Sequence, residues 1–103
     1  MKQFEIYEAD LSPVIGSEQG GIRPVIILQS VFNGMDRILC APITSKEFNN
    51  DTHIMVNTQD GKSVYIMSEQ IRNIDKERLR EKIDELAKED YQKVKDKLLK
   101  LMK

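Results

Sequence analysis

The sequence is poor in the residues that build cross-links and metal sites, with one cysteine and one histidine among 103 residues. The single Cys40 excludes an intramolecular disulfide and suits a reducing compartment. One histidine and one cysteine are also too few for a zinc site with its usual four ligands. We therefore expect a cytoplasmic protein without a metal centre.

Long apolar runs and an excess of charge of either sign are missing as well. No run approaches the roughly 18–20 apolar residues of a membrane span, and no basic segment precedes an apolar one at the N-terminus. Sixteen basic against seventeen acidic residues leave a formal net charge of -1, so the chain has no overall electrostatic footprint for nucleic acid. We expect no membrane partner, and a site for a polyanion would have to be a local patch.

The chain is expected to form one domain over residues 1–103, because 40% of its residues are hydrophobic and can build a modest core. Short apolar or alternating stretches between turn residues predict a small, mostly antiparallel β structure in the first three quarters. The predicted strands cover residues 5–11, 24–29, 37–44, 52–56 and 63–74, with turns at Asn33-Gly34 and Asp60-Gly61. Pro42 is expected to bend the third strand or to place it at a sheet edge.

The composition changes at Asp75, after which lysine and glutamate dominate. Apolar residues then recur at gaps of three to five, a pattern that would allow one helix for the whole tail. They are Leu79, Ile83, Leu86, Tyr91, Val94, Leu98 and Leu101. Only residues 88–102 predict a helix strongly by themselves, with the charged residues on a solvated face and the apolar ones toward the core.

A glycine-rich stretch, residues 16–24, leads into the most apolar part of the chain. Gly20-Gly21 permits positive φ or the close approach of a ligand, and Pro24 biases Arg23 toward extended geometry. A guanidinium at the mouth of a buried strand suits a phosphate or a carboxylate, because its donors form a rigid fork that stays charged. An ordinary hairpin loop with a surface arginine explains the stretch equally well.

Few other residues offer chemistry. Cys40 and His53 would form a nucleophile–base pair only if the fold brought them together, and the apolar surroundings of Cys40 favour a buried thiol. His53 is interpreted as a structural residue or a peripheral ligand contact. The sequence contains no phosphate-loop lysine, no dinucleotide fingerprint and no nucleophile elbow.

What remains is a set of polar groups spread over the β region. They are Arg23, the hydroxyls of Thr44 and Ser45, and Glu69, Gln70 and Arg72 on a predicted strand. Thr44-Ser45 also fits a strand end that hydrogen-bonds its own turn. From the residues alone, both interpretations stay open.

Five blocks follow one another along nearly the whole chain. They are Asp10-Leu11-Ser12-Pro13, the run from Gly16 to Pro24, Ala41-Pro42-Ile43-Thr44-Ser45, Thr52-His53, and Glu69-Gln70-Ile71-Arg72-Asn73-Ile74-Asp75-Lys76. Together they resemble the MazF/PemK toxin endoribonucleases. The resemblance implies a mainly β fold with a C-terminal helix, a small SH3-like β-barrel of the MazF/CcdB-like toxin type. It also implies a symmetric homodimer that cleaves single-stranded mRNA at a short sequence, without metal or other cofactor, and a cognate MazE-like antitoxin that inhibits it.

The resemblance also implies which residues act. The family's catalytic arginine matches Arg23 and its catalytic threonine matches Thr44. Its RNA-closing loop falls on Ser17, Glu18, Gln19, Gly20 and Gly21, and further RNA contacts are predicted at Ser45, Glu69 and Gln70. After Asp75 the family has a short helix, a short strand near residues 82–86 and a terminal helix, which we expect here in place of one long helix.

Three positions depart from the family pattern. Phe4-Glu5 stands where Gly-Asp is usual, Asp51 replaces a proline before Thr-His, and Lys62 replaces an acidic residue before the long strand. The first two concern local turns. The third could change base preference or the antitoxin contact.

Two rival functions remain within the resemblance. One is a catalytically inactive homologue that only binds RNA or antitoxin, against which the retained Arg23 and Thr44 argue. The other is a gyrase-poisoning toxin on the same barrel, against which the RNA-site motifs argue.

Overall fold

The computed structural model describes residues 2–12, 21–29, 36–47 and 51–101. The strands within these residues are β1 Glu5–Asp10, β2 Ile22–Gln29, β3 Arg37–Thr44, β4 His53–Asn57, β5 Ser63–Met67, β6 Arg72–Asp75 and β7 Leu79–Glu85. Three 3-10 turns (η1 Ser68–Gln70, η2 Lys76–Arg78 and η3 Lys88–Asp90) and one helix (α1 Tyr91–Leu101) complete the elements seen there. The strands form one antiparallel sheet in the order β4-β5-β3-β2-β1-β7, and β6 pairs with β3.

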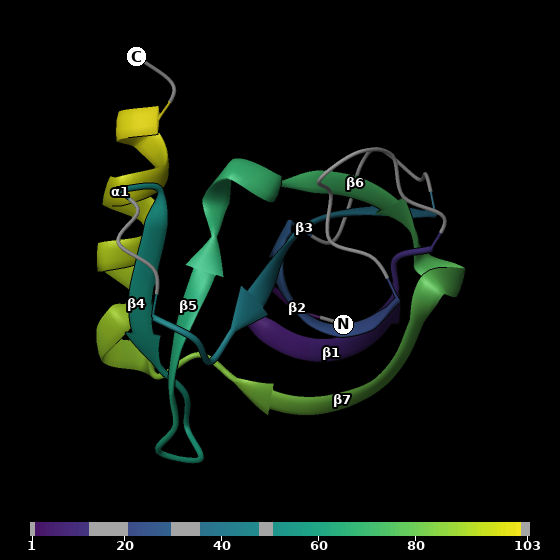
Figure 1. The fold of residues 1–103 in the computed structure, drawn as a ribbon, viewed down its shortest axis with the longest axis horizontal. Helices are drawn as coiled ribbons and strands as arrows, with labels where there is room; N and C mark the ends of the chain where they lie inside the picture. Colours follow the sequence, from purple (N-terminus) through teal and green to yellow (C-terminus); the bar gives the residue numbers. More distant parts are fainter. Residues whose placement is uncertain (1, 13–20, 30–35, 48–50, 102–103) are drawn as a thin grey trace.

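The sheet curls so that its two ends approach each other, with β7 passing below β1 and α1 standing beside β4 (Figure 1). Thr58 bridges Leu86 just after β4 and β7 end, and Gln59 N donates a hydrogen bond of 2.8 Å to Glu85 O. Ala87 N donates a further bond of 2.9 Å to Asn57 O. The expected mainly β, SH3-like fold with a terminal helix is confirmed, as a curled sheet whose edges meet at one end without closing into a continuous barrel.

The apolar residues of the sheet gather into two clusters. The first cluster contains Ile26 and Leu28 of β2, and the second contains Val25 and Ile27 of the same strand. Because successive residues of a strand point to opposite faces, β2 is buried on both sides, as its unbroken apolar run predicts. The first cluster also receives Val94 of α1, so the helix covers one side of the core.

Of the two alternatives predicted for Pro42, a bend in the strand or a place at a sheet edge, the edge is wrong because Pro42 lies inside the sheet. β3 pairs with β2 along one side, where Pro42 faces Val25. On the other side β3 pairs with β6 over residues 37–40 and with β5 over residues 43–44. Pro42 stands between these two segments, where the strand changes neighbours.

The predicted long strand over residues 63–74 is also wrong. The turn η1 divides it into β5, which pairs with β4 and the end of β3, and β6, which pairs with the start of β3. The buried Ser68 fastens this turn by donating its hydroxyl to the carbonyl of Thr52. Glu69 and Gln70 therefore lie in a turn and not on a strand.

The tail after Asp75 is not one helix, and the pattern implied by the family resemblance is the correct one. Asp75 Oδ1 accepts from Glu77 N at 2.8 Å and caps η2. β7 then pairs with β1 and begins three residues before the predicted strand. Within the described residues, no helix has the length and apolar character needed to cross a membrane.

Phe4 shows how this chain accommodates one departure from the family pattern. It has φ 70°, in the left-handed region that glycine adopts without steric cost. The phenyl ring is 2% exposed and lies 4.8 Å, centroid to centroid, from the ring of Tyr91. Phe4 O also accepts from Leu86 N at 2.9 Å. Burial of the ring and this pairing offset the backbone strain of a bulky residue at a position where the family resemblance implies glycine.

Candidate active site

β2 and β3 bring Arg23 and Thr44 to the same end of the sheet. The register pairs Val25 with Pro42, and its continuation by two residues aligns Arg23 with Thr44. Residues two apart share a face, so both side chains stand on the face of the second apolar cluster. Directly opposed residues of antiparallel strands have Cβ atoms about 4.5–5.5 Å apart, close enough for both to contact one phosphate.

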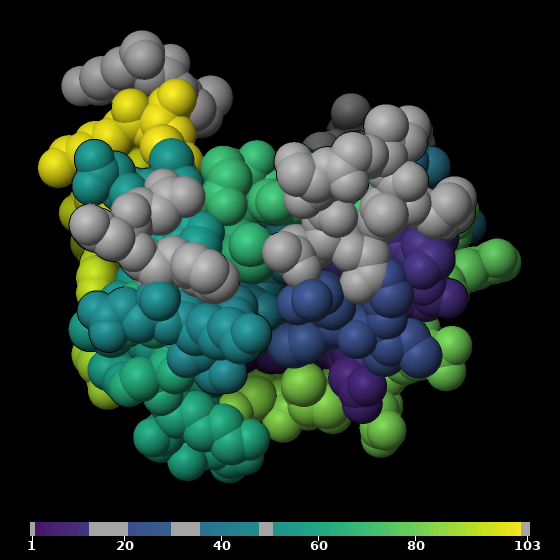
Figure 2. Space-filling view, in the orientation of Figure 1, coloured from purple at the N-terminus to yellow at the C-terminus, as the bar shows by residue number. Residues whose placement is uncertain are grey.

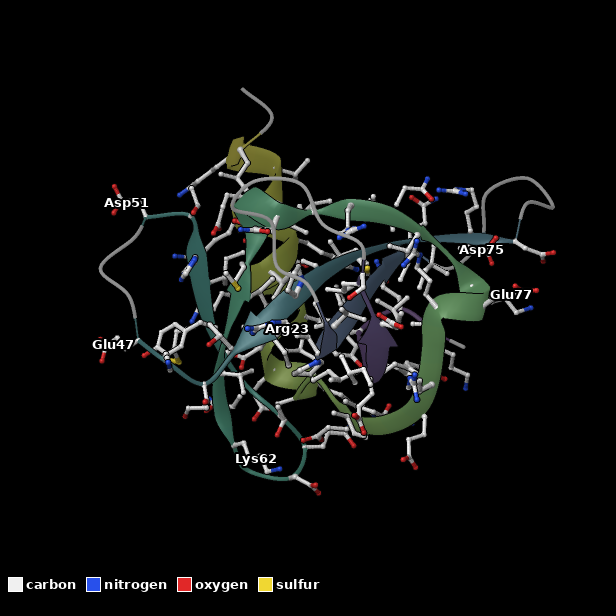
Figure 3. The ribbon with its side chains drawn as sticks, turned by 45° about the vertical axis from the view of Figure 1, so that its right-hand side comes forward. Arg23, Glu47, Asp51, Lys62, Asp75 and Glu77 are labelled. Carbon is white, nitrogen blue, oxygen red and sulfur yellow. The ribbon has the colours of Figure 1, made fainter. Side chains whose placement is uncertain are left out.

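The two strand segments also adjoin on the surface. In the space-filling view the dark blue atoms at the start of β2 adjoin the lighter blue atoms at the end of β3 (Figure 2). With side chains drawn, Arg23 lies near the centre of the view, Glu47 and Asp51 lie toward one margin, and Asp75 and Glu77 lie toward the other (Figure 3). Arg23, which is half-buried, thus lies near the middle of this view, with the labelled carboxylates toward its margins.

The Thr44 hydroxyl already has a partner. Its Oγ1 accepts from Lys46 N at 3.1 Å, which confirms the interpretation that the strand end holds its own turn. A hydroxyl has one donor hydrogen and two acceptor lone pairs, so this bond leaves the hydrogen available to donate. The amide fixes the oxygen atom in place, and the structural and chemical interpretations are compatible. Ser45 follows and is exposed.

Glu69 forms a polar cluster with Thr52 and His53 that residue-level reasoning missed. Thr52 Oγ1 donates to Glu69 Oε1 at 2.8 Å, and His53 Nε2 lies 3.0 Å from Glu69 Oε2. The His53 side chain is 4% exposed, so its structural interpretation is confirmed. The Asp60-Gly61 turn was the available signal, because a hairpin folded there pairs His53 with Met67 and sets Thr52 close to Glu69.

The surroundings keep Glu69 ionised. Burial by itself would raise the pKa of this carboxyl, but hydrogen bonds from its own amide, Thr52 and His53, with the charge of His53, bring the pKa below 4.5. Both oxygens therefore already accept hydrogen bonds from protein groups. A nucleotide base that contacts Glu69 would have to share these oxygens. Gln70 follows in η1 and is half-buried.

Glu69→Gln should make the protein less stable at neutral pH and have little effect in acid. A carboxyl whose pKa is lowered by folding contributes stability above its unfolded pKa, and loses it as pH falls through the folded pKa. Because the side chain is 32% exposed, we expect less than about 1 kcal/mol. Thermal unfolding at pH 7 and pH 3 measures this, with exposed Glu81→Gln as the control. A destabilisation as large at pH 3 as at pH 7 would contradict the assignment.

Cys40 and His53 do not form a nucleophile–base pair. Cys40 packs in the second apolar cluster, and burial raises the pKa of its thiol to about 12 despite the opposing charge of Arg72. His53 is bound to Glu69. Among the residues whose positions are described, no group of three or more histidine, cysteine, aspartate or glutamate side chains is placed to hold a metal ion. The predicted RNA contacts at 17–20 lie outside that part of the chain.

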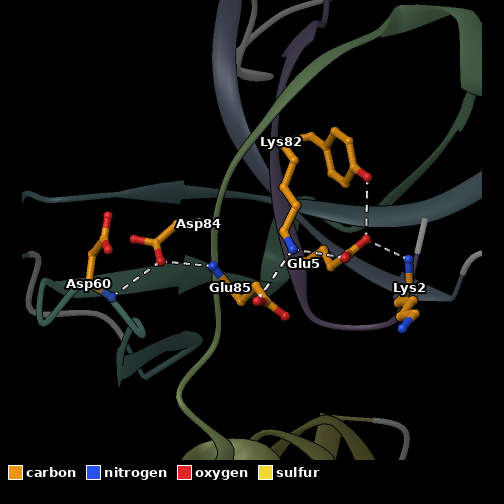
Figure 4. A network of polar contacts seen from close by, with 7 residues as sticks. Lys2, Glu5, Asp60, Lys82, Asp84 and Glu85 are labelled. Carbon is orange, nitrogen blue, oxygen red and sulfur yellow. Dashed lines mark hydrogen bonds and ion pairs between the residues drawn. The ribbon is translucent and has the colours of Figure 1, made fainter.

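A separate network joins β1 to β7 away from these residues (Figure 4). Glu5 is 8% exposed, and its carboxylate accepts from Lys2 N at 2.7 Å and pairs with Lys82 Nζ at 3.0 Å. Tyr7 Oη donates to Glu5 Oε1 at 3.3 Å. Burial would raise the pKa of Glu5, but the bonds from Lys2, Lys82 and Tyr7 lower it below 4.5. The buried carboxylate is therefore a structural charge that ties the two strands together.

Glu5→Ala should cost about 1–3 kcal/mol at pH 7, since it removes an acceptor of charge-assisted hydrogen bonds. The lowered pKa places this stability above pH 4.5 and predicts its loss as pH falls through the folded pKa. Thermal unfolding should show a midpoint lower by several degrees at pH 7, and a smaller difference at pH 3. Glu8→Ala on the same strand is the control. Equal destabilisation by the two variants would contradict the role given to Glu5.

The chain is similar to one protein family and to known proteins along most of its length. A family model described as PemK-like, MazF-like toxin of type II toxin-antitoxin systems matches residues 2–102. Endoribonuclease EndoA of Bacillus subtilis is 38% identical over 95% of this chain and 90% of its own length. Endoribonuclease MazF of Staphylococcus saprophyticus is 40% identical over 91% of this chain and 84% of its own.

Solved structures agree on the fold. MazF of Deinococcus radiodurans superposes with a TM-score of 0.82 at 24% identity, over 99% of this chain and 96% of that one. The same toxin in a MazE–MazF crystal structure gives a TM-score of 0.76, over 99% of this chain and 95% of that one. The fold is thus shared along the full length of the described chain.

Proposed function

The chain belongs to the PemK-like, MazF-like family of type II toxins, and from this we propose that it is an endoribonuclease that cleaves single-stranded mRNA at a short sequence. The observation that carries the proposal is the family match over residues 2–102. It is joined to the β2–β3 register, whose continuation by two residues past the Val25–Pro42 pair aligns Arg23 with Thr44. Cleavage of mRNA would stop translation and growth, the action expected of a toxin.

The proposed reaction uses a nucleophile that RNA itself supplies. The ribose 2′-hydroxyl loses its proton to a base and its oxygen attacks the adjacent phosphorus. The bond from phosphorus to the 5′-oxygen breaks, and the leaving 5′-oxygen takes up a proton. The products are a 2′,3′-cyclic phosphate and a 5′-hydroxyl. The protein has to align these atoms and stabilise the additional charge on the phosphoryl oxygens.

Arg23 and Thr44 are assigned these tasks. The guanidinium of Arg23 would bind the phosphoryl oxygens through a rigid fork of donors and could protonate the leaving 5′-oxygen. Thr44, whose oxygen is held by the Lys46 amide, would donate its hydroxyl hydrogen to the same phosphate. Each preorganised donor of this kind is worth about 10²–10³ in rate.

Base recognition is assigned to a second set of polar residues. Proteins read single-stranded RNA by contacting the edges of unstacked bases, and Ser17, Glu18, Gln19, Gly20, Ser45, Glu69 and Gln70 are the proposed contacts. Lys62 lies in the turn between β4 and β5, at the opposite end of β5 from Glu69. Within one chain, Lys62 therefore lies away from Glu69 and Gln70.

We assign the protein a homodimeric state, a cognate antitoxin and a cytoplasmic location. The Deinococcus radiodurans toxin has been crystallised as a MazE–MazF complex, which supports an antitoxin of the MazE type as the partner. A disordered, acidic segment of such an antitoxin would compete with polyanionic RNA while ordering on the toxin. The cytoplasm is where mRNA is translated.

Incubation of a long mRNA with the purified chain, followed by primer extension, tests the proposal. We expect cuts at one recurring short sequence, and none with Arg23→Ala over the same time. An intact transcript together with RNA binding would support the inactive homologue. An intact transcript together with trapped gyrase–DNA breaks would support the gyrase poison. Either result would exclude the proposed activity.

A further inference from the structure

The two ends of the β1–β2 connection are fastened to each other beside Arg23. Leu11 N donates to Gly21 O at 2.9 Å, and Gly21 N donates to Ser12 Oγ at 3.1 Å. Ser12 N in turn donates to Asp10 Oδ1 at 3.0 Å. Gly21 has φ 72°, a conformation that glycine adopts readily. These contacts among Asp10, Leu11, Ser12 and Gly21 are called the clasp below.

Arg78 connects the clasp to a distant part of the chain. Its Nη1 donates to Asp10 O at 3.1 Å and also to the carbonyl of Ser12. Both carbonyls lie on the side of the clasp that follows β1. Arg78 itself lies in η2, between β6 and β7. A guanidinium suits this role because it stays charged and presents its donors in a fixed plane.

Contacts of the neighbouring residues hold the backbone of Arg78. Asp75 caps η2, the turn that contains Arg78. Leu79, the next residue, pairs with Ala9 of β1 and packs against the second apolar cluster, which contains Leu11. The guanidinium therefore extends from a fixed turn, and its two bonds restrain the backbone of the clasp relative to the core.

We propose that Arg78 is a positioning residue, which holds the clasp and thereby sets where Arg23 stands opposite Thr44. Arg23 is two residues beyond Gly21 and pairs with Ala9, next to Asp10 in β1. A displacement of the clasp is thus transmitted directly to Arg23, and a misplacement of about 1 Å can cost about 10² in rate. The inference rests on the proposed function, because it assigns Arg23 to the reaction.

Direct contact of Arg78 with RNA is a weaker explanation. Arg78 borders an open hollow that is also lined by Arg80 and by the carboxylates of Asp10, Asp75 and Glu77. Three carboxylates beside two guanidinium groups do not favour a phosphate. The nitrogen of Arg78 that contacts the clasp is also committed to two carbonyls.

Kinetics of Arg78→Met, with Arg80→Met as the matched control, test the inference. Arg78→Met should lower the cleavage rate at saturating RNA about ten- to hundredfold, with the half-saturating RNA concentration changed less than about threefold. Arg78→Lys keeps the positive charge but loses the planar fork of donors, and its rate should fall between those of wild type and Arg78→Met. Arg80→Met removes the same charge from the same hollow and should leave the rate within about twofold of wild type.

Two further measurements separate positioning from binding and from loss of fold. In an Arg23→Ala background, Arg78→Met should change the residual rate less than about threefold, because residues that act as a unit are not additive. Without RNA, Arg78→Met should speed hydrogen exchange at the amides of Leu11 and Gly21 tenfold or more, while core amides such as Ile26 keep their protection.

Several outcomes would overturn the inference. Unchanged exchange at Leu11 and Gly21 would show that Arg78 does not hold the clasp. An equal loss of rate with and without Arg23 would show that it acts independently of Arg23, as a residue that binds RNA would. A wild-type chain that cuts no RNA would overturn the proposed function, and the exchange result would then still decide whether Arg78 holds the clasp.

Discussion

Replacing Arg23 by alanine is expected to slow RNA cleavage by about 10²–10³, while the protein keeps a melting temperature close to that of wild type. Arg23 is half-buried at the start of β2 and aligned with Thr44, where its guanidinium would meet the charge that develops on the phosphoryl oxygens. Removal of one preorganised donor of this kind typically costs this factor. Single-turnover cleavage of a short RNA containing the target sequence measures the rate without a contribution from product release.

Matched substitutions sharpen this result. Arg23→Lys keeps the charge and loses the planar fork, so its rate should lie between those of wild type and Arg23→Ala. Thr44→Val keeps the shape of the side chain and loses the hydroxyl, and should cost about 10². Thr44→Ser keeps the hydroxyl and should stay within about tenfold of wild type. Full activity of Thr44→Val would leave Thr44 with only its bond to Lys46.

An RNA with one deoxynucleotide on the 5′ side of the cleaved bond is expected to bind normally and to remain uncut. The proposed nucleophile is the 2′-hydroxyl of that nucleotide, so its removal deletes the attacking atom while the phosphate and bases stay in place. Gel electrophoresis would follow cleavage, and fluorescence anisotropy would follow binding. The expected loss of rate is limited only by the detection range of the assay.

The same RNA with a deoxynucleotide several positions away serves as the control. It should be cut nearly as fast as unmodified RNA, since distant 2′-hydroxyl groups take no part in bond breaking. Normal cleavage of the RNA that is modified at the cut site would mean that another nucleophile attacks the phosphate. The roles of Arg23 and Thr44 would then have to be assigned again.

The β region could be predicted from sequence because its signals are local. The apolar run that became β2 reads as a strand buried on both faces, and the Asp60-Gly61 turn correctly marks the hairpin, with Gly61 at φ 82°. The break at η1 could not be predicted, because it depends on which strand lies next to β3 at each end. Local propensity carries no information about a change of neighbours.

The structure of the tail after Asp75 could not be predicted from its apolar spacing. Its apolar spacing suits a helix, but residues 79–85 form β7 because the edge of β1 is there to pair with it. Tertiary pairing outweighs intrinsic preference in such a segment. The family resemblance identified the strand where periodicity did not.

For the candidate site, the family resemblance proposed Arg23 and Thr44, and the β2–β3 register, continued by two residues past the Val25–Pro42 pair, aligns them. The turn formed by Thr44 and Lys46 was one of two open interpretations, and the structure contains it. The contacts of Arg78 with Asp10 and Ser12 join residues 66–68 positions apart. No periodicity or motif encodes such a contact, so only the folded chain reveals it.

The most direct test of the central claim is the chemical nature of the cut ends. A defined RNA should be digested by the purified chain in EDTA and its fragments analysed by mass spectrometry. Cleavage by the substrate's own 2′-hydroxyl predicts undiminished cutting, a 2′,3′-cyclic phosphate on the upstream fragment and a 5′-hydroxyl on the downstream one. Fragments that end in a 3′-hydroxyl and a 5′-phosphate, or a reaction that stops in EDTA, would contradict the account.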